Sequence, residues 1–65
     1  MRQDEAGTID RLAMLLDDEA SGRPFDPLEA IRLAQDVSRI IPEIAPFMSS
    51  LIGRMKSRHA RMAAA

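Results

Sequence analysis

The sequence predicts an all-α fold, either a small three-helix bundle or a helical hairpin with a third helix. Apolar residues recur at helical spacing in three segments. Glycine and proline separate these segments, and no stretch has the β-branched and aromatic density that is typical of a strand. We therefore expect a single helical domain over residues 1–65, with flexible ends at 1–6 and 62–65.

The first helix is expected to begin near Thr8, whose hydroxyl is a possible N-cap. Its end is predicted by Ser21 and Gly22 followed by Pro24, because glycine adopts the left-handed C′ conformation easily and proline cannot continue a helix. The apolar stripe of this segment consists of Ile9, Leu12, Ala13, Leu16 and Ala20. This spacing indicates an amphipathic helix.

The start of the second helix is the clearest local signal in the chain. Asp26 fits the N-cap, Pro27 fits N1 and Glu29 fits N3, a pattern similar to a capping box. Phe25 precedes the cap, where it can fold back on the first turn. The apolar stripe that follows contains Ala30, Leu33, Val37, Ile40 and Ile44, flanked by Ile31, Ala34 and Ile41. An apolar face this wide implies that the second helix has two neighbours.

Two prolines separate the second helix from the third. Pro42 predicts that the second helix ends at Ile41 or is kinked there, because the residue before proline is displaced from helical geometry. Pro46 fits the N1 position of a third helix. Gly53 either weakens that helix by up to about 1 kcal/mol or allows a close helix crossing. The third helix carries the apolar residues Phe47, Met48, Leu51, Ile52, Met55 and Met62.

The charge of the chain is distributed unevenly. The net charge is −1, but residues 1–20 sum to −4 and residues 46–65 sum to +4. We expect the acidic first helix and the basic last helix to lie near each other or to complement their own helix dipoles. The alternative is that the basic end docks on an acidic partner.

The composition excludes several classes of site. The chain has no cysteine and a single histidine, so it has neither a disulfide framework nor a thiolate zinc site. The run Asp17-Asp18-Glu19 lacks the spacing of a calcium loop, and His59 has no neighbouring acid to orient it. No catalytic motif is present, so we expect no enzymatic activity, no cofactor and no metal site.

The sequence shows neither a basic-then-apolar leader nor an apolar run long enough to span a membrane. We therefore expect a soluble cytoplasmic protein without a membrane partner. Its apolar content of 46% exceeds what 65 residues can bury, so part of the apolar surface should face a partner. The expected docking face consists of Leu33, Ile40, Ile44, Phe47, Met48, Leu51 and Met55, with Arg54, Lys56 and Arg58 at a polar rim. Homodimerisation is the nearest variant of this hypothesis.

No motif assigns the chain to a family. In size and helical character it resembles the small helical bacterial antiactivators that sequester transcription factors, and its eight arginines against one lysine resemble proteins of high-GC bacteria. The resemblance implies a non-enzymatic protein-binding regulator whose partner is a transcription factor.

The alternative function is a dimeric, helix-turn-helix-like DNA-binding protein that uses the basic C-terminal helix. Its negative net charge counts against this alternative, as do the two prolines in the turn and the lack of base-reading Asn or Gln on the third helix.

Overall fold

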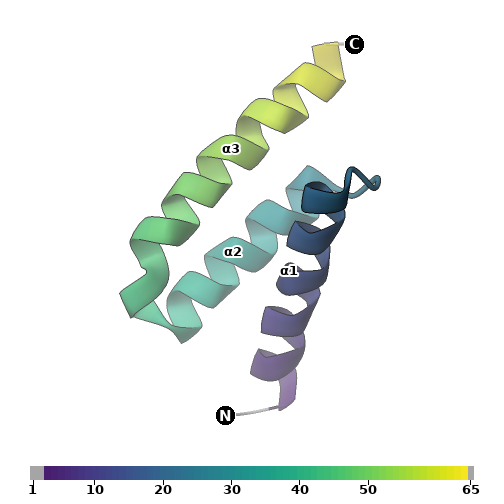
Figure 1. Ribbon diagram of the computed structural model, residues 1–65. Helices are drawn as coiled ribbons and strands as arrows, with labels where there is room; N and C mark the ends of the chain where they lie inside the picture. Colours follow the sequence, from purple (N-terminus) through teal and green to yellow (C-terminus); the bar gives the residue numbers. More distant parts are fainter. Residues whose placement is uncertain (1–2, 65) are drawn as a thin grey trace.

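The computed structural model describes the backbone of residues 3–64 and the side chains of residues 5–62. Its elements are α1 (Gln3–Ser21), α2 (Pro27–Ile40), the 3₁₀ turn η1 (Pro42–Ile44) and α3 (Ala45–Ala64), with no strand in this part of the chain. The helix α2 packs against both α1 and α3, and α3 runs back along α2 in the opposite direction (Figure 1). The predicted all-α three-helix fold is confirmed.

The helix α1 starts earlier than the sequence analysis predicted. It begins at Gln3, so the expected start near Thr8 is wrong and Thr8 lies within the helix. Glu5 and Ala6 are good helix formers, and an acidic side chain near a helix N-terminus complements the helix dipole. Of the ends expected to be flexible, residues 1, 2 and 65 lie outside the described residues, and the others continue α1 and α3. Flexibility of those ends stays a prediction.

The predicted end of α1 is confirmed. Gly22 has a φ of 76°, a left-handed conformation that favours glycine. The Gly22 N–H donates to the carbonyl of Glu19 at 3.2 Å, and the Arg23 N–H donates to the carbonyl of Asp18 at 2.8 Å. These two bonds form a Schellman motif, which satisfies the last carbonyls of the helix and turns the chain toward α2.

The predicted start of α2 is also confirmed. Asp26 has extended backbone geometry, and its carboxylate accepts a hydrogen bond from the Leu28 N–H at 3.0 Å. Pro27 is the first residue of the helix. The Glu29 carboxylate accepts two hydrogen bonds from Arg11, at 3.2 and 3.0 Å, and so joins α2 to α1. These hydrogen bonds and the charge of Glu29 raise the pKa of Arg11.

The helix α2 does not continue through Pro42. It ends at Ile40, and Ile41 has a φ of −128° and a ψ of 84°, as the proline that follows it requires. The Ile41 N–H still donates to the carbonyl of Val37 at 2.8 Å, and η1 then leads directly into α3. Ile44 therefore lies in the turn, and its apolar spacing with the residues of α2 does not place it on that helix.

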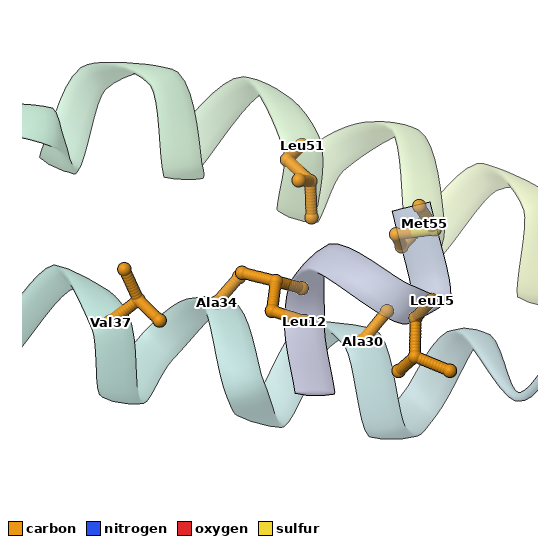
Figure 2. Close-up of a cluster of buried hydrophobic side chains, with 7 residues drawn as sticks. All are labelled: Leu12, Leu15, Ala30, Ala34, Val37, Leu51 and Met55. Atoms are coloured by element: carbon orange, nitrogen blue, oxygen red, sulfur yellow. The ribbon is translucent and has the colours of Figure 1, made fainter. Parts of the chain in front are cut away.

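The core lies where α2 meets its two neighbours. It contains Leu12 and Leu15 of α1, Ala30, Ala34 and Val37 of α2, and Leu51 and Met55 of α3 (Figure 2). Ala30 and Ala34 have no exposed surface. Their small side chains sit at the centre of the packed face of α2, whereas Leu33 is only half-buried at its edge. The centre of the predicted stripe was therefore displaced around the helix.

Gly53 does not lie at a close helix crossing. A Cβ atom added to this residue meets no other atom within 4 Å, and Gly53 is exposed. Of the two interpretations of this glycine, the close crossing is wrong. Its remaining effect is the lower helix propensity of glycine within α3.

Candidate protein-binding surface

The structure separates the ten residues of the predicted docking face and rim into buried and exposed groups. Met55 is 0% exposed and Leu51 is 6% exposed, and both belong to the core. Figure 2 shows Leu51 pointing from α3 toward α2. Because their surface is already covered by the chain's own helices, these two residues cannot contact a partner in this fold. Including them in a docking face was an error.

The exposed part of the predicted face lies at the junction of η1 and α3. Phe47 is 72% exposed, more than any other large apolar side chain among the described residues. Ile44 and Met48 are half-buried, and each packs partly against the core. Since these two residues lie within one helical turn of Phe47, the three form an apolar surface with a fixed base. We call Ile44, Phe47 and Met48 the corner patch.

Two other members of the predicted face lie elsewhere. Ile40 lines a shallow groove with Glu5 and Thr8 of α1 and with Asp36 and Arg39 of α2. Leu33 packs against the core from the edge of the buried face of α2. The corner patch is therefore smaller than the surface expected from helical spacing.

The predicted basic rim is largely occupied within the chain. Arg54 donates two hydrogen bonds to the Glu19 carboxylate, at 3.1 and 2.9 Å. The guanidinium of Arg58 lies 3.6 Å from the same carboxylate and 5.3 Å from the ring centroid of Phe25. Lys56 is exposed. These pairs confirm that the acidic first helix and the basic last helix lie near each other.

The acidic run at the end of α1 is also paired with arginine. Arg23 donates to Asp17 at 2.5 Å and to Asp18 at 2.8 Å, and these hydrogen bonds raise the pKa of Arg23. Glu19, the third acid of the run, is bound by α3. Within the described residues, no three histidine or acidic side chains are grouped to hold a metal ion.

The sequence analysis missed a groove beside the last turns of α3. It has a volume of about 600 Å³ and is lined by Pro24, Phe25, Asp26, Pro27, His59 and Met62. Met62 lies two helical turns after Met55 and therefore on the same face of α3, yet it is 57% exposed. The reason is that α3 extends past the start of α2, so nothing in the described chain covers this face. We call this feature the end groove.

The signal for the end groove was present in the sequence. Met62 continues the apolar stripe of the third helix, while Pro27 marks where the second helix begins. Comparing the two helix lengths would have indicated an uncovered apolar turn.

No helix in the described part of the chain combines the length and apolar character needed to cross a membrane. No protein-family model matches the chain, and searches of curated proteins and of solved structures gave no match either.

Proposed function

We propose that this protein is a non-enzymatic regulator that binds another protein through the corner patch. The exposure of Phe47 carries the proposal, because 72% of this aromatic side chain faces solvent at a rigid junction of two elements. Burying a phenylalanine side chain contributes about 1.5–3 kcal/mol, which a partner gains by covering it.

The surroundings of Phe47 suit a protein interface. Ile44 and Met48 pack partly against the core, so the base of the patch is held in place before binding. Aromatic residues and methionine are enriched at the centres of interfaces, which are bordered by polar residues. Pro46, Ser49 and Ser50 are exposed beside Phe47 and supply such a border.

The partner we propose is a transcription factor in the cytoplasm, sequestered in the manner of a small helical antiactivator. Support for this identity comes from the size and helical character of the chain. The corner patch itself specifies only an apolar partner surface able to receive an aromatic side chain.

DNA binding by α3 has less support. Arg54 and Arg58 are engaged by Glu19, which removes two of the four basic residues of this helix from phosphate contacts. The helices of a helix-turn-helix cross at a large angle, whereas α3 runs back along α2 (Figure 1). Titration of the purified protein with a DNA duplex at low salt tests this alternative, and absence of binding there removes it.

The test of the proposed function is the substitution Phe47→Asp. The tagged wild type and the variant are used to capture proteins from an extract of the cells that produce the chain, and the recovered partner is then titrated as a purified protein. We expect Phe47→Asp to weaken binding at least tenfold without changing the melting temperature, because Phe47 is exposed.

The matched control is Leu28→Asp. Leu28 is 46% exposed and lies in the first turn of α2, at the opposite end of that helix from the corner patch. It should bind as the wild type does. Equal affinity of Phe47→Asp and wild type for the purified partner contradicts binding through the corner patch.

A further inference from the structure

The end groove is an apolar surface with a basic border. His59 and Met62 form its α3 side, and Lys56 and Arg61 lie on opposite flanks of that helical face. Residues 46–65 contain no acid. Because Glu19 engages Arg54 and Arg58, the exposed Lys56 and Arg61 supply the uncompensated positive charge next to the groove.

The only acidic residue lining the end groove is already engaged. The Asp26 carboxylate accepts the hydrogen bond from the Leu28 N–H that caps α2. The groove volume of about 600 Å³ lies within the range of protein sites that bind small molecules or side chains. The complementary ligand is therefore an apolar side chain with carboxylates on either side of it.

The outer face of α1 has this composition. Met14 is 58% exposed, although it lies on a helix whose opposite face is in the core. Asp10 precedes Met14 by four residues and Asp17 follows it by three, so all three share one helical face. Both acids are exposed. Asp17 also pairs with Arg23, but 70% of its side chain remains accessible.

We propose that the end groove binds the outer face of α1 from a second copy of this chain. Met14 of one copy enters the groove of the other, and its Asp10 and Asp17 lie near Lys56 and Arg61. The two surfaces differ, so the contact is heterologous, with one surface contributed by each copy. The corner patch takes no part in this contact, which is therefore independent of the proposed function.

The first experiment is sedimentation velocity of the purified protein over a range of concentrations at low and high salt. We expect concentration-dependent self-association that weakens at high salt, because opposite charges border the contact. The variants Met14→Asp and Met62→Asp should each remain monomeric. Both residues are more than half exposed, so both variants should retain the helicity and melting temperature of the wild type.

The decisive measurement is the equimolar mixture of these two variants. Met14→Asp retains an intact groove and Met62→Asp retains an intact α1 face, so the mixture should form a heterodimer through one wild-type contact. Phe47→Asp should self-associate as the wild type does, which separates this contact from the corner patch.

Three results overturn the proposal. They are a wild type that stays monomeric at low salt and high concentration, self-association of either single variant at the wild-type level, and a mixture that remains monomeric although the wild type associates. The last result means that identical surfaces pair, in conflict with a heterologous contact.

Discussion

Arg54 of α3 donates two hydrogen bonds to the carboxylate of Glu19 near the end of α1, across 35 positions of sequence. Only 13% of the Glu19 side chain is exposed, and Arg58 lies within ion-pair distance of the same carboxylate. The backbones of α1 and α3 each approach α2. Glu19 therefore provides a direct electrostatic link between the two outer helices.

Replacing Glu19 with glutamine should lower the free energy of unfolding by about 1 kcal/mol, because the variant keeps the shape of the side chain but loses its charge. Chemical denaturation at low salt measures the change, which should shrink in concentrated salt. Glu43→Gln serves as the control, since Glu43 is exposed, and it should alter stability by less than about 0.5 kcal/mol. An equal effect of both substitutions contradicts a specific role for Glu19.

Gly53→Ala should stabilise the protein by about 0.5–1 kcal/mol. The position is helical and exposed, and the added methyl group meets no atom within 4 Å, so the higher helix propensity of alanine is gained without a clash. Gly22→Ala should have the opposite sign, because Gly22 has a φ of 76°. Thermal unfolding by circular dichroism compares the two variants, and a lower melting temperature for Gly53→Ala argues against this account.

Ala34→Leu should destabilise the fold by about 1–3 kcal/mol through overpacking. Ala34 is 0% exposed and belongs to the core cluster that joins all three helices. Ala13→Leu introduces the same side chain at an exposed position of α1 and should change stability by less than about 0.5 kcal/mol. If Ala34→Leu is as stable as Ala13→Leu, the helices are packed less closely than described.

Met55→Ala should cost about 2–5 kcal/mol, because the truncation leaves a cavity in the core. For a domain of 65 residues this is a large share of the total stability, so the variant should be largely unfolded at elevated temperature. Phe47→Ala removes a larger side chain from an exposed position and should leave the denaturation midpoint nearly unchanged. Similar losses for both variants contradict the division between core and corner patch.

The boundaries of the helices were mostly predictable because their signals are local. Gly22, the Asp26-Pro27 pair and Pro42 act through backbone geometry and hydrogen bonds within a few residues. The start of α1 was missed because Thr8, a good N-cap, also fits within a helix. The rotation of α2 was missed because Ala30 and Ala34 become central only when two other helices press against the same face.

The candidate surfaces were only partly predictable, for a related reason. Helical spacing places Phe47, Leu51 and Met55 on one apolar side of the third helix but does not show which of them the chain itself covers. That division depends on the tertiary contact with α2, which buries Leu51 and Met55 and leaves Phe47 exposed. The end groove likewise depends on how far α3 extends beyond α2.

The position of α2 between its two neighbours also bears on how the chain reaches its native state. Each interhelical packing contact joins elements that follow one another in the sequence, with a connection of only a few residues. Short loops close at little entropic cost, and proteins with such local topology fold within microseconds to milliseconds. Pairing of α2 with either neighbour can therefore begin as soon as those two segments are helical, and the chain should fold at the fast end of the range for small domains.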